Sequence, residues 1–454
     1  MNPSTDLGVR QSFARDASGL ELVPDAVARP TTEAEVLEVL RQARADARSV
    51  TPAGGQTSTT GASITDGAVL LSLRGLGEVG EIDRERLTIR VQSGVNLGDL
   101  KRRLAAEGLL FAPDPTSEDD VTVGGAIACN ASGARSLLYG ATRSHVVALR
   151  VALADGRVHE LRRSRLEKNT VGYQPVHEPV DWFIGSEGTL GVILEAELSL
   201  LPLPATVTGL AIPFSREADA LEFVVASRSS TEVSARCIEF FDAAALIVAR
   251  SATETASWSN GAGALVYVEQ AGAEGSDVPL DRWLALGERF GATEADILVY
   301  EGEAALREAR RLRHAVPATM NERGARYRAV GGRKVSTDWA VPYRRLADAI
   351  AEARRLAAGA GVEQAVIYGH AGNGHPHQNF IARDASELAR IEKVVEDTLH
   401  HVVARGGTVA AEHGIGKLKR RWLSLQLSPM QLGVMRAMKR ELDPTGMLAP
   451  GNLF

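Results

Sequence analysis

Three loops built from small residues lie in the first half of the chain and constrain its fold more than any other feature. They are Pro52–Ser58 (PAGGQTS), Thr122–Gly133 (TVGGAIACNASG) and Gly185–Gly191 (GSEGTLG). Each offers a run of backbone N–H groups with little side-chain bulk, as a phosphate or a dinucleotide requires. A single loop of this kind is more often a tight turn. Three of them, in a chain with 44 glycines, favour a large ligand lying along the backbone.

A fourth glycine pattern does not indicate a cofactor site. Gly75, Gly77 and Gly80 match GxGxxG and follow a predicted strand. In a dinucleotide-binding fold this motif opens a helix whose N-terminus holds the pyrophosphate. Residues 81–91, EIDRERLTIRV, predict a charged turn and another strand instead. We therefore expect no Rossmann site at these glycines.

The second half of the chain concentrates three of its ten histidines in YGHAGNGHPHQNF, residues 368–380. Glycines between His370 and His377 allow the chain to reverse and bring the two rings together. By the period of two in a strand, His375, His377 and Asn379 share one face. One metal site can use these side chains.

A second cluster, GTVAAEHGIGKLKR at residues 407–420, places Glu412 beside His413 before a glycine-rich turn. We expect both clusters at strand ends. Two histidines and a glutamate are a common ligand set for a divalent metal with open positions, and His413 would be left free as a base. A lone histidine is more often structural, but five such side chains in two glycine-flanked clusters favour a functional site.

Composition narrows the function classes. The net charge of −6 gives no electrostatic footprint for nucleic acid. Two cysteines, Cys129 and Cys237, support neither a disulfide framework nor an iron–sulfur cluster ligated by this chain alone. The first thirty residues lack the apolar core of a signal peptide, and no stretch has the length of a membrane span. We expect a cytoplasmic protein, compatible with reversible docking on a membrane.

The pattern of elements predicts an α+β protein. Thr32 and Glu35 have the spacing of a capping box at a helix start, and Asn96 can cap a second helix. The apolar runs within 146–161 predict a hairpin around Asp155-Gly156. Three longer helical patterns occupy 303–316, 343–361 and 386–406. We divide the chain into an N-terminal segment at 1–28 and domains at 29–204 and 205–454.

Taken together and in order, these motifs resemble those of one flavoprotein family. The pieces are PAGGQTS, DPTSEDDVTVGGAIACNASGARSLLYGATR, IGSEGTLG, HxGxGxxH, AEHGIGK and LDPTGMLAPGN. The chain, from about Arg29 to its C-terminus, is similar to the FAD-linked D-2-hydroxyacid dehydrogenases of the vanillyl-alcohol oxidase superfamily. That group includes cytochrome-type D-lactate dehydrogenase, the glycolate oxidase D subunit and D-2-hydroxyglutarate dehydrogenase.

The resemblance implies a PCMH-type FAD-binding domain at 29–204. An α+β cap domain for the substrate would follow at 205–454, with a C-terminal segment that returns to the flavin. The first two loops would hold the pyrophosphate and ribityl chain, and the third would face the adenine side. The residues implied to bind FAD are Pro52, Ala53, Gly54, Gly55, Gln56, Thr57, Ser58, Pro115, Thr116, Gly124, Gly125, Ala128, Asn130, Ser132, Gly133, Tyr139, Gly140, Glu187, Gly188, Gly191, Val192 and Ile193.

The same resemblance implies the chemistry. A small D-2-hydroxy acid such as D-lactate or glycolate would be oxidised to the 2-oxo acid. A divalent cation, zinc in kind, would be bound by His370, His377 and Glu412, and His413 would be the base. The residues implied to contact the substrate carboxylate are Arg313, Lys334 and Asn379. Electrons would leave the flavin for a separate acceptor, which we expect to be a quinone, a cytochrome or an electron-transfer flavoprotein.

The chain departs from the family pattern HxGDGNxH at two positions. Asn373 replaces the aspartate, which predicts the loss of an outer carboxylate that orients a ligand histidine. His375 replaces the asparagine, and its imidazole can join either the metal or the substrate. Pro317 replaces a hydroxyl side chain of the hydroxyglutarate enzymes, which favours a smaller or differently shaped acid. The sequence leaves the assembly open, and a homodimer is compatible with it.

The sequence is also compatible with three other functions. A different flavoenzyme of the same fold, similar to alkylglycerone-phosphate synthase, would carry a histidine-rich loop where this chain has AEHG. A flavin-free metal-dependent hydrolase would use the same metal ligands but would not need three glycine loops. A non-catalytic electron-transfer subunit would bind FAD without being reduced by a hydroxy acid.

Overall fold

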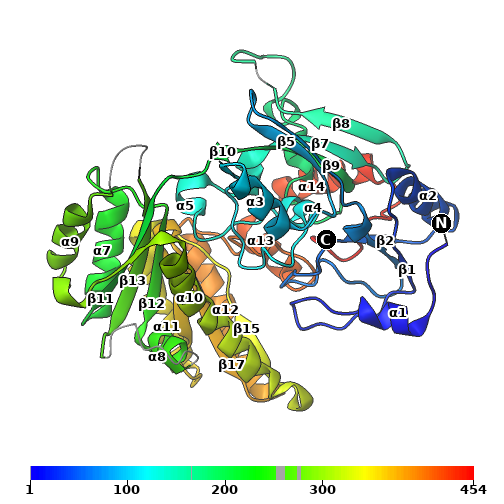
Figure 1. The fold of residues 1–454 in the computed structure, drawn as a ribbon. Coiled ribbons are helices and arrows are strands. Elements are labelled where there is room, and N and C mark those ends of the chain that lie inside the picture. Colours follow the sequence, from blue (N-terminus) through cyan, green and yellow to red (C-terminus); the bar gives the residue numbers. More distant parts are fainter. Residues whose placement is uncertain (1, 165, 252–260, 273–277) are drawn as a thin grey trace. The chain divides into compact units, whose positions relative to one another are not determined.

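The computed structural model describes residues 2–164, 166–251, 261–272 and 278–454 (Figure 1). The chain forms two compact units. Unit 1 consists of the residues up to Gly133, Gly140–Leu203 and Glu412–Phe454, and unit 2 of Ala134–Tyr139 and Pro204–Ala411. The chain therefore passes between the units four times, and its C-terminal segment belongs to unit 1. The fold class is α+β, as predicted.

Unit 1 contains a five-stranded antiparallel sheet with the order β4-β5-β9-β7-β8. Ile89, Leu149 and Leu198 from this sheet are buried in one core with Leu100 of helix α3 (Leu97–Ala106). Asn96 caps α3, and strands β7 and β8 form the hairpin, as the sequence predicts. The strands are β4 (Val79–Asp83), β5 (Thr88–Gln92), β7 (Val146–Ala152), β8 (Val158–Arg162) and β9 (Val192–Ser199).

A parallel three-stranded sheet of order β1-β3-β2 forms the second layer of unit 1. Thr32 caps helix α2 as predicted, but the carboxylate of Glu35 accepts from the N–H of Thr31 rather than that of Thr32. The capping box is therefore incomplete. Met447 and Leu448 complete the core under α2. The elements are β1 (Ala26–Ala28), α2 (Glu33–Ala45), β2 (Val50–Ala53) and β3 (Val69–Ser72).

The GxGxxG match has a structural explanation. No helix follows Gly80, because β4 and β5 occupy the next residues. A Cβ on Gly75 would overlap the carbonyl oxygen of Pro30, so close packing requires this glycine. The neighbouring Arg74 donates to the carbonyl oxygens of Gly54 and Gly55, at 3.0 and 2.8 Å. The predicted absence of a Rossmann helix here is confirmed.

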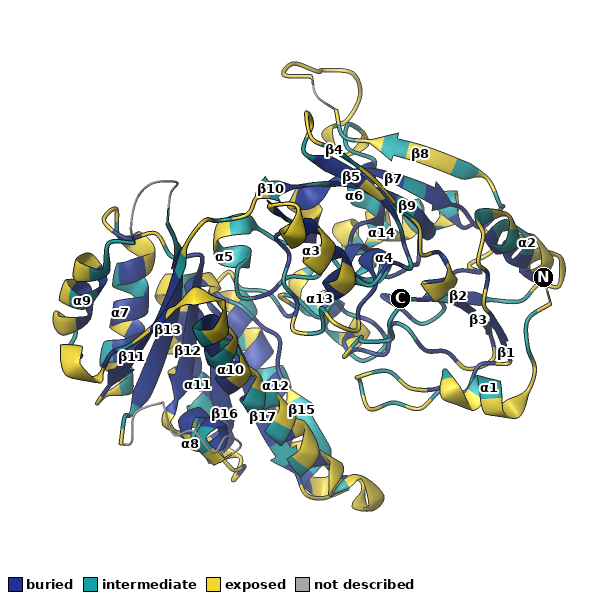
Figure 2. Ribbon diagram, viewed as in Figure 1, coloured by how far each residue is buried: buried dark blue, intermediate teal, exposed yellow. Residues whose placement is uncertain are grey.

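Unit 2 is built on an antiparallel seven-stranded sheet with the order β14-β11-β13-β12-β16-β17-β15. Its central strands are almost wholly buried, while the helices expose their outer sides (Figure 2). Burial on both faces requires a helix layer on each side of the sheet. The strands are β11 (Val207–Phe214), β12 (Cys237–Asp242), β13 (Ala264–Ala271), β14 (Leu298–Glu301), β15 (Arg333–Ser336), β16 (Val366–His370) and β17 (His375–Ala382).

Two helices, α8 and α10, cover the face that carries Phe241, Tyr267 and Tyr368. Four others, α7, α9, α11 and α12, cover the opposite face (Figure 1). The three longer helical patterns of the sequence correspond to α10, α11 and α12, so these predictions are confirmed. The helices are α7 (Glu217–Ser229), α8 (Ala243–Ser251), α9 (Leu280–Glu288), α10 (Gly302–Ala325), α11 (Leu346–Gly359) and α12 (Ala385–Ala404).

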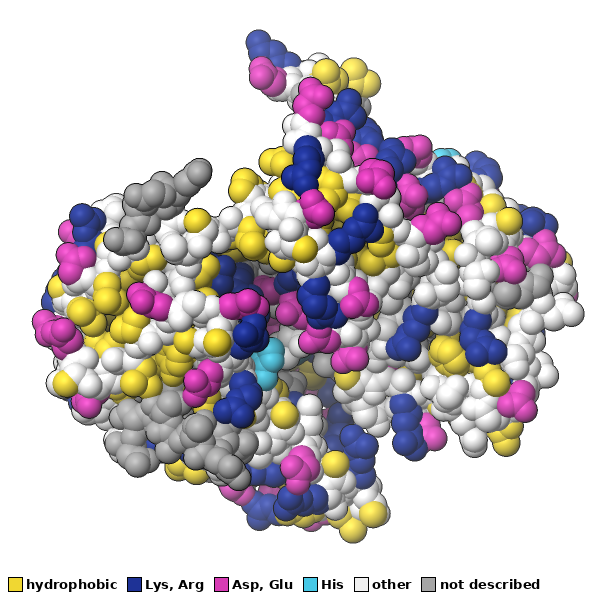
Figure 3. Space-filling model, in the orientation of Figure 1, with side chains coloured by type: hydrophobic (Ala, Val, Ile, Leu, Met, Phe, Trp, Pro, Cys, Tyr) yellow, Lys and Arg dark blue, Asp and Glu magenta, His cyan; other side chains and the backbone are white. Residues whose placement is uncertain are grey.

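The surface carries mixed charge. On the face drawn in Figure 3, Lys and Arg side chains are interspersed with Asp and Glu side chains. Within the described ranges, no helix is both long enough and apolar enough to cross a membrane. The remaining elements are short, apart from α14: α1 (Leu7–Ser12), β6 (Leu109–Leu110), α4 (Val123–Ala128), α5 (Ser136–Tyr139), α6 (Val180–Phe183), β10 (Leu201–Pro202), α13 (Leu423–Gln426) and α14 (Pro429–Leu442).

Candidate active site

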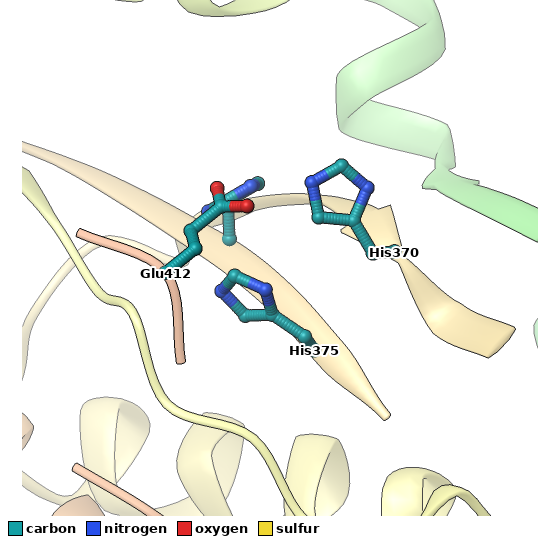
Figure 4. Close-up of side chains that lie close together, drawn as sticks. His370, His375 and Glu412 are labelled. Carbon is teal, nitrogen blue, oxygen red and sulfur yellow. The ribbon is translucent and has the colours of Figure 1, made fainter. Parts of the chain in front are cut away.

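The histidine stretch forms the predicted hairpin of β16 and β17. His370 pairs directly with His375, and Tyr368 pairs with His377. Because directly paired residues project from the same side of a sheet, all three imidazoles lie on one face. Gly374 makes the turn with φ +67°, and a Cβ there would overlap the carbonyl oxygen of Val341. Figure 4 shows the rings of His370 and His375 close together on the two strands.

The three imidazoles form a compact triangle within unit 2. The ring centroids are 5.4 Å apart for His370 and His375, 5.3 Å for His370 and His377, and 4.6 Å for His375 and His377. One nitrogen from each ring lies within 4.8 Å of the others, and all three side chains are buried. Two nitrogens bound to one transition-metal ion at about 2.0–2.1 Å lie at most about 4.2 Å apart, so a small shift of the rings lets all three bind one ion. The residues present therefore fit a metal ion.

Glu239 of β12 orients His370 and was not predicted from the sequence. Its Oε1 lies 2.6 Å from His370 Nδ1, and its Oε2 accepts from Arg313 Nε at 2.7 Å. Burial opposes ionisation of Glu239, but His370 and Arg313 outweigh it and hold the pKa of this carboxyl well below its ordinary value. Glu239 is thus an outer carboxylate for His370, supplied by a strand distant in sequence from Asn373.

The predicted substrate residues come from three elements of unit 2. Arg313 of α10 is buried in its ion pair with Glu239. Lys334 and Asn379 project from the same sheet face as the histidines, since β15 and β17 pair with Ser336 opposite Asn379. Burial lowers the pKa of Lys334 to about 8, and no described residue forms an ion pair with its amine. Asn379 donates to Tyr368 Oη at 2.9 Å, but its buried Oδ1 has no hydrogen-bond partner among the described residues.

A second buried carboxylate, Glu269 of β13, lies on the same sheet face. It accepts from Arg135 Nε at 3.0 Å, Arg236 Nε at 2.7 Å and Tyr267 Oη at 3.0 Å. Burial opposes its ionisation, yet the two arginines lower the pKa of Glu269 to about 2. Arg135 belongs to the short segment 134–139, so this ion pair fixes that segment on unit 2.

We expect the Glu269 network to weaken in acid. Its pKa is about 2 in the folded chain and 4.5 ordinarily, so its contribution is complete above pH 4.5 and is lost as the pH falls toward 2. That difference corresponds to about 3 kcal/mol in the free energy of unfolding. Urea unfolding between pH 5 and pH 3 should therefore show a steeper loss for the wild type than for Glu269→Gln. Parallel pH profiles in the two proteins would contradict this assignment.

In unit 1, the first small-residue loop presents backbone donors. The N–H groups of Gly55, Gln56, Thr57 and Ser58 donate to no acceptor within the described residues. Gln56 has φ +55°, which turns successive N–H groups toward a common side. Its side-chain amide is held at 2.9 Å from the carbonyl oxygen of Phe13. This row of donors fits the anionic pyrophosphate of FAD.

Each of the three loops holds one residue other than glycine in the left-handed region. These are Gln56 at φ +55°, Asn130 at φ +49° and Glu187 at φ +51°. Such conformations cost about 1–3 kcal/mol each and persist only where the surroundings hold them, often at ligand sites. The N–H of Glu187 donates to the carbonyl oxygen of Ala128 at 2.8 Å, which joins the third loop to the second.

Several loop glycines are explained by packing within the protein. A Cβ on Gly54 would overlap Thr122 Oγ1, one on Gly55 would overlap the carbonyl oxygen of Asp120, and one on Gly133 would overlap that of Asp114. Gly54 therefore lets the first loop pack against the second, and Gly55 and Gly133 pack against the backbone that precedes the second loop. Packing within the protein is therefore one reason for the many glycines in these loops, and close approach of a ligand is the other.

The AEHGIGK segment is attached to the third loop. Both carboxylate oxygens of Glu187 accept backbone N–H groups, from Ile415 at 2.6 Å and Gly416 at 2.7 Å. Burial raises the pKa of Glu187, and these hydrogen bonds oppose the rise.

In the AEHGIGK segment, Glu412 Oε1 lies 3.3 Å from His413 Nε2. The prediction that Glu412 and His413 follow a strand is wrong, because only an isolated bridge at Thr408 precedes them.

The structure gathers the predicted FAD residues in unit 1, apart from Tyr139, which ends α5 in unit 2. The predicted metal ligands belong to different units. His370 and His377 lie in unit 2, whereas Glu412 is the first residue of the C-terminal part of unit 1. Two carboxylates near the imidazoles, Glu239 and Asp338, were missed. Asp338 Oδ1 lies 3.2 Å from His375 Nε2.

Comparisons with known proteins agree with this arrangement. Residues 24–162 match the FAD binding domain family, and residues 203–453 match the family of FAD linked oxidases, C-terminal domain. Glycolate oxidase subunit GlcD of Bacillus subtilis is 30% identical over 95% of this chain and 89% of its own. D-lactate dehydrogenase of Anaerostipes hadrus is 29% identical over 98% and 93%, and D-2-hydroxyglutarate dehydrogenase of Xanthomonas citri is 30% identical over 95% and 89%.

Solved structures share the fold at lower identity. An alkyldihydroxyacetonephosphate synthase structure has a TM-score of 0.72 and 19% sequence identity, and covers 98% of this chain and 81% of its own. At that identity the likeness concerns the fold alone. The family match over residues 203–453 and the near full-length relatives carry the assignment further. The chain belongs to the FAD-linked oxidase family, among the FAD-linked oxidoreductases of the D-2-hydroxyacid dehydrogenase type.

Proposed function

We propose that the protein oxidises a small D-2-hydroxy acid, of the lactate and glycolate class, to the corresponding 2-oxo acid. The observation that carries the proposal is the polar face of the unit 2 sheet. There, three buried imidazoles share one side with the amine of Lys334 and with Asn379 Oδ1, neither of which has a matching partner among the described residues. A substrate carboxylate supplies the counter-charge that the amine lacks. Two relatives are named D-lactate dehydrogenase and glycolate oxidase subunit GlcD, and these names indicate the same substrate class.

FAD is the proposed electron acceptor in the first half-reaction. The N–H groups of Gly55–Ser58 would bind its pyrophosphate, with the other two loops along the rest of the cofactor. When bound, FAD takes up the hydride that leaves the α-carbon of the acid. The residues that would hold and orient the cofactor are Pro52–Ser58, Pro115, Thr116, Gly124, Gly125, Ala128, Asn130, Ser132, Gly133, Tyr139, Gly140, Glu187, Gly188, Gly191, Val192 and Ile193. A separate quinone, cytochrome or electron-transfer flavoprotein would be the final acceptor of the electrons.

A divalent cation, zinc in our proposal, would be held by His370, His377 and Glu412. Ala411, which precedes Glu412, is fixed in unit 2 because its N–H donates to the carbonyl oxygen of Asp338 at 2.8 Å. When bound, such an ion acts as a Lewis acid that lowers the pKa of the substrate hydroxyl. Glu239 fixes the ring of His370 in the orientation in which its other nitrogen can serve as a ligand.

The remaining roles fall to side chains of this chain. The ammonium of Lys334 and the guanidinium of Arg313 would pair with the substrate carboxylate, and Asn379 would fix its orientation. His413 would accept the proton of the hydroxyl group as the α-hydrogen departs with its electron pair. The acid thus loses one proton and one hydride and becomes the 2-oxo acid. Cys129 and Cys237 are free thiols, which suits the reducing cytoplasm that we propose as its location.

The decisive test is the visible absorption spectrum of the purified protein under anaerobic conditions. D-lactate, glycolate, D-2-hydroxyglutarate and the L-enantiomers of the chiral acids are added separately. We expect one D-acid or glycolate to bleach the flavin band, and the L-acids to leave it unchanged. A flavin band that none of these acids bleaches would contradict the proposed reaction. Active protein without any flavin would instead favour a metal-dependent hydrolase.

A further inference from the structure

We propose that His375 is a third imidazole ligand of the metal ion, so that one hairpin supplies three nitrogen ligands. The proposal deepens the proposed function and rests on it only for the presence of a metal. His375 occupies a position where the family pattern described above has asparagine. The assignment to the metal rather than to the substrate follows from the register, the burial and the hydrogen bonding of this side chain.

The register places His375 at the metal candidates. His375 is the direct cross-strand partner of His370, and its ring centroid lies 4.6 Å from that of His377. The three rings meet at angles of 56° to 78°, so none is stacked flat on another. A nitrogen of His375 lies within 4.8 Å of a nitrogen of each of the other two rings. If only His370 and His377 bound the ion, the imidazole of His375 would still lie next to it without binding it.

Hydrogen bonding leaves His375 incomplete in the protein alone. The residue is 4% exposed, and its Nε2 has no hydrogen-bond partner among the described residues. The carboxylate of Asp338 lies 3.2 Å away, but the geometry does not make a hydrogen bond. A buried polar atom without a partner costs about 1–3 kcal/mol, so a purely structural role is disfavoured. A metal ion bound to Nε2 supplies the partner that this nitrogen lacks.

Three imidazoles change which metal the site selects. Imidazole nitrogen suits zinc, copper, iron and nickel, whereas magnesium and manganese suit oxygen-rich sites. With the carboxylate proposed from Glu412, the set becomes three nitrogens and one oxygen. We therefore expect this protein to bind Zn²⁺ far more tightly than Mn²⁺. Replacing His375 with asparagine exchanges a nitrogen donor for an amide oxygen and should reduce that preference.

The test uses the full-length protein with FAD bound. Metal is removed by a chelator and Zn²⁺ alone is added back, and X-ray absorption at the zinc edge then counts the imidazoles around the ion. We expect three in the wild type and two in His375→Asn. We also expect His375→Asn to weaken Zn²⁺ binding by more than about 100-fold, beyond the 10–100-fold effect of losing an outer partner. His400→Asn, at an exposed histidine of α12, should match the wild type in both measurements.

Two imidazoles in the wild type would overturn the proposal, as would a smaller affinity loss in His375→Asn. If that variant fails to fold, the wild-type count alone decides. Failure of the proposed reaction is distinguishable, because the count needs no turnover. Three imidazoles around zinc, together with a flavin that no hydroxy acid bleaches, would keep the metal site and reject the reaction. Two imidazoles with a flavin that D-lactate bleaches would do the reverse.

Discussion

Replacing His413 with glutamine is expected to slow flavin reduction by the hydroxy acid about 10²- to 10⁴-fold, which is the usual contribution of a positioned general base. The variant should keep its FAD, because the turn that carries His413 is held through the N–H groups of Ile415 and Gly416 on Glu187. His413 itself contributes a side chain that is 25% exposed and therefore open to a reactant. Stopped-flow absorbance under anaerobic conditions measures the rate.

The matched control is His159→Gln, since His159 is an exposed histidine of β8 in the same unit. It should reduce its flavin at the wild-type rate. If His413→Gln also reduces its flavin at that rate, His413 is not the base. Loss of FAD from the variant would show instead that the side chain supports the cofactor site.

Glu239→Gln is expected to destabilise unit 2 by about 3–5 kcal/mol, because it removes one partner of a buried ion pair and leaves Arg313 without its counter-charge. The same change removes the carboxylate that orients His370, so Zn²⁺ affinity should fall about 10–100-fold. Urea unfolding measures the first effect, and competition with a chelating dye measures the second.

An exposed ion pair on α10 provides the control. Glu322 and Arg326 are joined at 2.7 Å, with side chains 70% and 67% exposed, so Glu322→Gln should cost less than about 1 kcal/mol. The double variant Glu239→Gln with Arg313→Gln should lose less stability than the two single variants together, by on the order of 1–3 kcal/mol. Full additivity would show that the two buried groups act independently.

Local signals in the sequence were sufficient for the elements that depend on neighbours in the chain. The hairpin around Gly374, the helix capped by Asn96 and the turn at Asp155-Gly156 each follow from the conformational preferences of a few adjacent residues. The incomplete capping box shows the limit of this method. Glu35 reached one residue further back than expected, to Thr31, which spacing alone does not resolve.

The site was only partly predictable for a different reason. His370 and His377 are close in sequence, whereas Glu239, the partner of His370, lies in another strand. Its segment, CIEFFD, has the pattern of an ordinary buried strand. A glutamate on the covered face of such a strand is itself a signal, because an unpaired carboxylate there is costly. The sequence does not say which distant cation or imidazole pairs with it. That information depends on strand order, which brings β12 beside β16.

The fourfold passage of the chain between the two units has a consequence for biosynthesis. Strand β2 near the N-terminus is bridged at Val50 by Leu448, and Met447 and Leu448 fill the core under α2. Unit 1 therefore cannot complete its packing until its last segment has left the ribosome, by which time all of unit 2 has been synthesised. We therefore expect unit 2 to fold first, while unit 1, into which it is inserted, is still incomplete. A nascent chain stalled before residue 412 should protect the seven-stranded sheet from protease, while the FAD cradle stays open to cleavage.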